Sequence, residues 1–95
     1  MSKSNREAVI VRTYSAGVHF GRLVERNGKE VKLADARRIW SWKGANTLNE
    51  IATMGVGKGS RVSVAVESIL LLEAIEIILC TSGAAKVLDA AEWNK

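Results

Sequence analysis

The chain has 95 residues, 47% hydrophobic and 25% charged, a composition typical of one folded domain with a single small core. This length excludes a catalytic domain joined to a separate binding domain, while one Cys and one His exclude an internal disulfide and a conventional zinc site. We therefore expect one domain over 1–95, with residues 1–6 as a disordered N-terminal tail, and neither a metal nor a cofactor.

The net charge of +4 is unevenly distributed along the chain. Residues 1–61 carry twelve Lys and Arg against five Asp and Glu, whereas residues 62–95 carry two against five. This imbalance favours a surface that faces an anionic partner, or subunits that meet basic face to acidic face, although a mixed solvated surface explains it equally well. The longest apolar stretch, 68–81, is too short to span a bilayer, and we expect a cytoplasmic protein.

Strand patterns occupy the first part of the chain. Residues 8–14 are rich in β-branched and aromatic side chains, which is typical of a strand. Residues 18–36 predict a hairpin, because Asn27 and Gly28 separate two alternating runs and suit the two central positions of a type I′ turn. The first element and this hairpin together predict three antiparallel strands.

The hairpin loop also determines which side chains face the core. Taking Asn27 and Gly28 as a two-residue loop pairs Val24 with Val31. Four apolar side chains then lie on the inner face: Phe20, Val24, Val31 and Leu33. His19 falls on the opposite face, which we expect to be half-solvated, as in most antiparallel sheets.

At the start of the second half of the chain, the hydrophobic residues change from the alternation of a strand to the spacing of a helix. Residues 46–55 predict a short amphipathic helix, because Thr47 and Glu50 form a capping-box pair and Gly55 is suited to end it. Two strands and a second helix follow the glycine-rich turn, at 61–67, 73–81 and 82–93.

Both later strands are expected to be buried. Val62, Val64 and Val66 alternate inward in the first, and the second is expected to be buried on both faces over its last half. The second helix is expected to dock across the sheet. The fold class is therefore α+β, a small antiparallel sheet or partly closed barrel of about five strands with two short helices, in the order βββαββα.

No group of residues has the spacing of an active site. Lys58 is followed by glycine and then by a strand, whereas a phosphate-binding loop leads into a helix. A catalytic His19 would need a nucleophile and an orienting carboxylate, which only a coincidence of the fold could supply from Ser15, Tyr14, Asp35 and Glu25. Glu73 and Glu76 point to opposite faces of a strand. Cys80, among apolar residues, is expected to be a buried structural thiol. We therefore expect that the protein is not an enzyme and has no catalytic residue.

The segment ARRIWSWKGANTL, residues 36–48, differs because all of its parts suit one task. If it is extended, Trp40 and Trp42 share a face with Arg38. Indoles stack on nucleobases and Arg pairs with phosphate, so this combination is typical of nucleotide binding. With His19 added as the only residue that titrates near neutral pH, the candidate ligand-binding residues are His19, Arg37, Arg38, Trp40, Trp42, Lys43 and Gly44.

Either tryptophan could instead complete the hydrophobic core, because the chain has few other aromatic side chains. Trp40 follows Ile39 and is the better suited of the two to the core. Trp42 is flanked by Ser41 and Lys43, which favours a surface or interface position. Trp42 is therefore the residue at which we first expect a ligand or a partner.

Three blocks of the sequence carry a resemblance, namely VRTYSAGVHFG (11–21), ARRIWSWKGANTL (36–48) and EAIEII (73–78). They are similar to the signature blocks of a small uncharacterised family encoded by bacteriophages and prophages, a domain of unknown function. The resemblance implies a phage protein that acts on host proteins or on host defence signals. Some counter-defence proteins of similar size sequester nucleotide second messengers in pockets formed by oligomers, using aromatic stacking and Arg contacts.

The leading hypothesis is a non-enzymatic, phage-encoded binding protein of the host cytoplasm. It would form a homo-oligomer and sequester an anionic nucleotide-type immune signal at a subunit interface. One alternative is a protein–protein inhibitor of a host protein, because Trp and Arg also dominate interface hot spots. A second alternative is a small nucleic-acid-binding protein, which the basic first part of the chain favours. None of these hypotheses involves a membrane.

Overall fold

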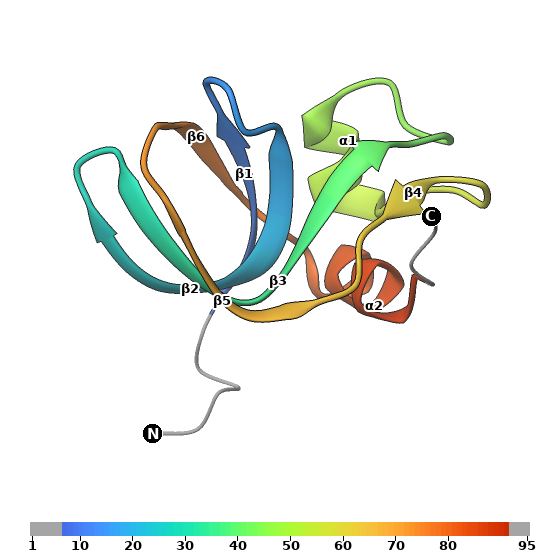
Figure 1. Cartoon of the computed structure of the whole chain (residues 1–95). Helices are drawn as coiled ribbons and strands as arrows, with labels where there is room; N and C mark the ends of the chain where they lie inside the picture. The colour runs from blue at the N-terminus through green and yellow to red at the C-terminus, as the bar shows by residue number, and fades with distance from the viewer. Residues whose placement is uncertain (1–6, 92–95) are drawn as a thin grey trace.

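The computed structural model describes residues 7–91 as a curled antiparallel sheet with two helices (Figure 1). The strands are β1 (Ala8–Thr13), β2 (Val18–Asn27), β3 (Glu30–Ser41), β4 (Arg61–Val62), β5 (Val66–Leu71) and β6 (Ala74–Leu79). The helices are α1 (Leu48–Met54) and α2 (Ser82–Ala90). The tail expected at 1–6 and the end of the helix expected at 82–93 lie outside the described residues. No helix within the described range is long and apolar enough to cross a membrane.

Strand β3 organises the sheet because it is twelve residues long and pairs along both edges. One edge pairs with β2, while the other pairs with β5 and, nearer the end of β3, with β4. The strand order is β4-β3-β2-β1-β6, with β5 also beside β3. The expected α+β class and antiparallel sheet are confirmed. The sheet has one more strand than expected because the pattern at 61–67 is divided between β4 and β5.

Both faces of the curled sheet are buried, each by a different partner. Alternate residues of a strand point to opposite faces, so β1 and β2 contribute to two separate clusters. The cluster that packs with the helices contains Ile10, Phe20, Ile39, Ile51, Val62 and Leu88. The cluster on the inner face of the curl contains Val9, Val11, Val31, Leu33, Ala36 and Leu71. The core of this small protein is therefore two thin layers, one on each side of the sheet.

A bulge at Asp35 changes the face to which the side chains of β3 point. Asp35 has a φ of 51°, and the ladder between β3 and β2 shifts its register nearby. Asp is among the residues that tolerate positive φ. Leu33 and Ala36 consequently belong to the same inner cluster, although strict alternation would place them on opposite faces. Arg38 and Trp40 then follow Ala36 on this inner side.

The expected loop of the β2–β3 hairpin is wrong by one residue. Asn27 still pairs within the ladder, so the loop consists of Gly28 and Lys29, and Gly28 has the positive φ of 59°. The register shifts again further along β2, so Leu23 packs against the inner cluster and Val24 is exposed. A prediction from the loop alone fails because each bulge exchanges the faces of the residues beyond it.

Burial in the hairpin agrees with the prediction except at two positions, Val24 and His19. The other apolar side chains expected inside, Phe20, Val31 and Leu33, are fully buried. His19 was expected on a half-solvated face, and this is wrong: the residue is buried and pairs with Val11 of β1. The physical reason is that the sheet curls over its inner face while the helices cover its outer face, so β2 has no solvated face here.

The strands after α1 are less buried than expected. Val62 is buried, but Val64 lies between β4 and β5 and is exposed, as is Val66. In the last half of β6, Leu79 is exposed and Ile77, Ile78 and Cys80 are only partly buried, so the expected burial of this half on both faces is wrong. Within residues 7–91, β5 and β6 each pair along one edge only, and Val64 belongs to neither strand.

The helices form as their capping residues predict. The Thr47 side chain accepts the N–H of Glu50 at the start of α1, and Gly55 ends the helix with a φ of 85°. These contacts confirm the helix expected at 46–55. Helix α2 packs against α1 and the sheet through residues that include Leu88, which places its C-terminal end beside β3 (Figure 1).

Gly55 is a position where any side chain should destabilise the fold. Its φ of 85° disfavours L-residues, and an added Cβ would lie 2.7 Å from the Cβ of Val87 in α2. We expect Gly55→Ala to lower the free energy of unfolding by more than about 1 kcal/mol, measured by urea denaturation. The matched control is Gly83→Ala in α2, where no heavy atom lies within 4 Å of the added Cβ. Equal stability of the two variants would contradict this prediction.

Candidate functional site

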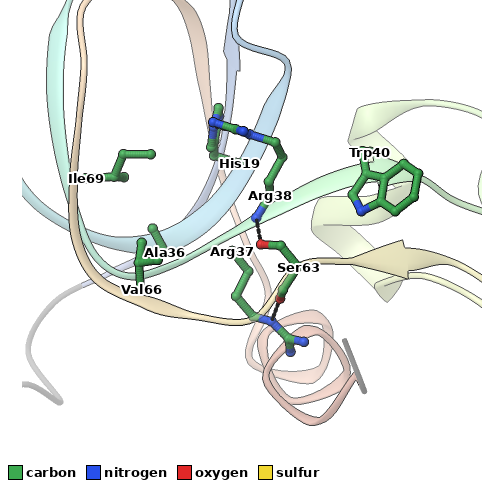
Figure 2. A pocket seen from close by; sticks show the side chains of 8 residues that line it. All are labelled: His19, Ala36, Arg37, Arg38, Trp40, Ser63, Val66 and Ile69. Atoms are coloured by element: carbon green, nitrogen blue, oxygen red, sulfur yellow. Dashed lines mark hydrogen bonds between the residues drawn. The ribbon is translucent and has the colours of Figure 1, made fainter. Parts of the chain in front are cut away.

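The segment of residues 36–48 begins in β3 and continues beyond the end of that strand at Ser41. Arg37 points toward α2, whereas Arg38 and Trp40 lie on the inner side of the sheet (Figure 2). Trp40 is 51% exposed, while Trp42 follows the strand and packs, partly buried, against the helix-facing cluster. The expected assignment of the tryptophans is therefore wrong, because Trp40 is the surface residue and Trp42 contributes to the core.

Arg37 is buried, and its guanidinium donates to backbone carbonyl oxygens. Its side chain is 7% exposed, its Nε donates to the carbonyl oxygen of Ser63 at 2.7 Å, and its Nη1 donates to the carbonyl oxygen of Leu88 at 2.8 Å. Burial lowers the pKa of Arg37, and the nearby Asp89 carboxylate acts in the opposite direction. Guanidinium donors commonly satisfy the free carbonyls at a helix C-terminus. Arg37 thus ties α2 to β3 and to the segment after β4.

Lys43 and Gly44 pack against the glycine-rich turn. The backbone N–H of Lys43 donates to Ser60 Oγ at 2.9 Å, and its carbonyl accepts the N–H of Gly57 at 2.6 Å. Gly44 has a φ of 82°, and an added Cβ would lie 3.0 Å from the Cα of Gly57. The side chain of Lys43 is exposed, but neither residue lines the pocket that contains Trp40.

A pocket of about 450 Å³ opens on the inner side of the sheet (Figure 2). Its lining residues are His19, Ala36, Arg37, Arg38, Trp40, Ser63, Val66 and Ile69. Four of the seven candidate residues are therefore brought together, while Trp42, Lys43 and Gly44 lie elsewhere. Sequence reasoning missed the other four, because they join the site through pairing and packing of β3 with β5 and with the segment after β4.

Ser63 fixes the backbone at the floor of this pocket. Its Oγ accepts the backbone N–H of Arg38 at 2.7 Å, and its own N–H donates to the Arg38 carbonyl at 2.8 Å. Its carbonyl accepts from Arg37, as Figure 2 shows. One serine therefore holds both arginines, although they point in different directions.

His19 and Arg38 form a hydrogen-bonded polar pair in the wall of the pocket. His19 is 1% exposed, and its Nε2 accepts a hydrogen bond from Arg38 Nε at 3.2 Å. An Nε2 that accepts carries no proton, so the neutral ring has its proton on Nδ1. Burial, and secondarily the Arg38 charge, lower the pKa of His19 to about 4. The ring is neutral at physiological pH, and its buried Nδ1 has no hydrogen-bond partner among residues 7–91.

The guanidinium of Arg38 is oriented but not neutralised. Arg38 is exposed, and within residues 7–91 no ion pair joins it to a carboxylate. Its Nε is held by His19, which leaves both Nη groups without a hydrogen-bond partner in the described part of the chain. Beside it, the guanidinium of Arg61 lies 5.1 Å from the Trp40 ring centroid. A half-exposed indole and an unneutralised guanidinium thus share one pocket.

The Cys80 thiol does not line this pocket. Burial raises the pKa of the half-buried Cys80 thiol to about 11, so the thiol is protonated at neutral pH. Within residues 7–91, no set of three or more His, Cys, Asp or Glu side chains is placed to hold a metal ion. The pocket lining itself combines the charged guanidinium of Arg38, the exposed indole of Trp40 and the neutral imidazole of His19.

Replacing Arg37 should destabilise the fold. Arg37→Met leaves the carbonyls of Ser63 and Leu88 without their donor, and each unsatisfied buried group costs about 1–3 kcal/mol. The control is Arg26→Met on the exposed hairpin end, where we expect a change within about 0.5 kcal/mol. Urea denaturation compares the two variants with the native chain. An Arg37→Met protein as stable as the Arg26→Met protein would refute the structural role.

Acidification should destabilise the protein through His19. Its pKa is about 4 in the fold against a usual 6.5, so between these values the unfolded state binds a proton that the folded state does not. The His19 pKa shift therefore does not reduce the free energy of unfolding above pH 6.5. As the pH falls toward 4, protonation of His19 in the unfolded state lowers that free energy by up to about 3 kcal/mol. His19→Gln should lose this part of the pH dependence in urea denaturation at about pH 7 and about pH 4.5. Parallel pH profiles of the two proteins would contradict the assignment.

Comparison with known proteins identifies a family without assigning a function. No match was found among curated proteins, and none among solved structures. A family model described as "Domain of unknown function (DUF6948)" matches residues 6–88. That range includes all strands of the sheet and every residue that lines the pocket. Because the match covers most of the chain, the protein belongs to the DUF6948 family.

Proposed function

We propose that the protein is a non-enzymatic binding protein that holds a small anionic ligand of nucleotide type in the pocket beside Trp40. The observation that carries this proposal is the state of Arg38. Its guanidinium is held on one side by His19 and has no carboxylate partner within residues 7–91. A phosphate would supply the missing negative charge and accept from both Nη groups, as arginine–phosphate pairs commonly do.

The rest of the pocket supports a ligand with a flat, apolar part. Trp40 is half exposed at the pocket wall, and Val66 and Ile69 supply apolar surface opposite β3. Stacking of a base on an aromatic side chain contributes about 1–3 kcal/mol. A volume of about 450 Å³ is within the range of small-molecule sites. The site therefore suits a base on Trp40 and a phosphate on Arg38.

The biological setting of this proposal comes from the sequence resemblance. A phage or prophage protein of this size, acting in the host cytoplasm, would use such a pocket to sequester a nucleotide immune signal rather than to transform it. Binding without turnover agrees with a site whose histidine is buried and neutral and whose lining does not include the Cys80 thiol. Counter-defence by sequestration is therefore the role that we propose.

One observation favours the alternative of a protein partner. Trp40 and Arg61 are stacked on the surface, and both residue types are enriched in interface hot spots. A host protein that inserts a carboxylate toward Arg38 would use the same surface. Nucleic-acid binding would instead rely on the exposed cations spread over the basic part of the chain and would weaken steeply with salt.

Thermal-shift measurements with cyclic dinucleotides, cyclic trinucleotides and ADP-ribose test the proposal. A ligand at ten times its Kd stabilises the native state by about 1.4 kcal/mol, which raises the Tm of a domain of this size by several degrees. We expect Arg38→Gln and Trp40→Ala each to weaken binding of the active probe by about tenfold or more. The control Arg26→Gln removes an exposed arginine outside the pocket and should bind as the native chain does.

The outcomes separate the three candidate functions. Stabilisation by one nucleotide that both pocket variants abolish supports sequestration, and release of a hydrolysed product would show an enzyme instead. If no nucleotide stabilises the protein and one host protein is captured in equal amount through Trp40, the protein-partner alternative replaces the proposal. Binding to single-stranded DNA that is unchanged by Trp40→Ala and lost at moderate salt would replace it with nucleic-acid binding.

A further inference from the structure

The sheet ends in two strands whose outer edges are unpaired. Within residues 7–91, β5 pairs only with β3, and β6 pairs only with β1. The two strands follow each other in the chain, separated by Leu72 and Glu73, but no ladder joins them. Figure 1 shows β5 crossing in front of the sheet while β6 lies behind it. Each edge therefore presents backbone N–H and C=O groups that a further strand could pair with.

The hydrogen-bonding pattern between β6 and β1 identifies which backbone N–H and C=O groups of β6 point away from β1. The N–H of Cys80 donates to the Ala8 carbonyl, so these residues form a hydrogen-bonded pair of the antiparallel ladder with β1. Hydrogen-bonded and non-hydrogen-bonded pairs alternate along such a ladder. Leu79 and Ile77, which pair with Val9 and Val11, therefore direct their backbone groups away from β1. From Glu76 to Leu79 the outer edge of β6 is therefore a template for another strand. At the start of β6, a bulge leaves Ile75 out of the ladder, and the Ala74 N–H donates to the Lys29 carbonyl at 3.0 Å.

Two of the features that usually prevent strand pairing, basic side chains and proline, are missing from both edges. The sequences VESILL of β5 and AIEIIL of β6 contain no Lys or Arg, and the chain has no proline. Each strand carries one acidic residue, Glu67 or Glu76, and Glu76 lies 3.9 Å from Arg12 of the neighbouring strand. Native proteins protect free edges with lysines, prolines or bulges. The edge of β5 and the part of β6 that follows its bulge at Ile75 therefore lack all three.

Exposed apolar side chains occur at matching positions on the two strands. Val66 and Leu70 of β5 are 45% and 55% exposed, and Ile75 and Leu79 of β6 are 50% and 59% exposed. The four-residue spacing does not put either pair on one face, because the ladder of β6 with β1 is bulged at Ile75. In β5, Val66 lines the pocket together with Ile69, the neighbour of Leu70. Both strands are six residues long. An antiparallel pairing along their full lengths would place Val66 opposite Leu79 and Leu70 opposite Ile75.

We propose that the protein forms a head-to-tail homo-oligomer in which β5 of one copy pairs antiparallel with β6 of a second copy. In the full-length register, Glu67 faces Ile78 of the second copy and Glu76 of the second copy faces Ile69, so no two carboxylates are directly opposite. A second copy is the occupant because every copy carries both complementary edges. Such a contact uses two different surfaces of each copy, so repeated contacts close into a ring or extend into a filament.

This contact adjoins the pocket but does not depend on the proposed function. Val66 belongs both to the free edge of β5 and to the wall of the pocket. Pairing of β6 from a second copy would place Leu79 of that copy beside Val66. The nucleotide-type site would then lie at a subunit interface, whereas failure of nucleotide binding would leave the strand contact unaffected.

Charged substitutions on each edge test the contact. Light scattering coupled to gel filtration should show the native chain as an oligomer, and Leu70→Lys and Leu79→Lys should each be monomeric. Both side chains are more than half exposed, so circular dichroism and Tm should remain those of the native chain. The matched control Met54→Lys alters an equally exposed side chain on α1 and should leave the oligomer intact.

Mixing the two variants distinguishes head-to-tail pairing from a symmetric contact. The Leu70→Lys chain retains a native β6 edge, and the Leu79→Lys chain retains a native β5 edge. Their equimolar mixture should therefore form a dimer with one native contact, although each variant alone is monomeric. A monomeric native chain overturns the proposal. So does a mixture that stays monomeric, or an oligomer that persists when Leu70 is replaced, because each requires a contact other than β5 with β6.

Discussion

Along β3, consecutive side chains must point to opposite faces of a curled sheet, and the helices cover only one of those faces. Arg37 and Arg38 are neighbours with the same chemistry, yet this alternation gives them different environments. Arg37 is buried against α2, where its donors satisfy backbone carbonyls. Arg38 lies on the inner side with two Nη groups that have no hydrogen-bond partner within residues 7–91, and the bulge at Asp35 is what places Ala36 and Arg38 on the same face as Leu33. The site therefore depends on a single backbone irregularity in the longest strand.

The buried His19 is neutral, so the positive charge of the His19–Arg38 pair lies on the Arg38 guanidinium. A charged imidazole on the inner face would lie beside the Arg38 guanidinium in a poorly solvated layer, so both burial and charge favour the neutral ring. The neutral ring accepts from Arg38 Nε, which restricts the guanidinium without neutralising it. An aspartate at the same position would form an ion pair and cancel the charge that a ligand would meet. His19 thus orients a cation while leaving its charge available.

Local signals in the sequence predict the elements well and the site only in part. The capping residues Thr47 and Glu50 identify α1, and alternation identifies β1, β2 and β3, because these features depend on neighbours in the chain. The hairpin register and the burial of His19 depend on bulges and on how far the sheet curls, which no short window contains. The expected positions of the two tryptophans, core for Trp40 and surface for Trp42, are reversed in the structure for the same reason. Trp40 still belongs to the strand, whereas the chain leaves the sheet before Trp42 and carries it to the helix side.

The pocket and the free edges have one structural origin. A barrel closed by pairing between β5 and β6 would have no outer edges, and its inner face would be filled by side chains. Here the two strands diverge, so the inner face stays accessible beside Val66 while both edges lose a ladder partner. In the oligomer that we propose, a second copy would restore the missing backbone pairing without refilling the inner face of the first. Association through the edges would then satisfy the backbone and leave the pocket open.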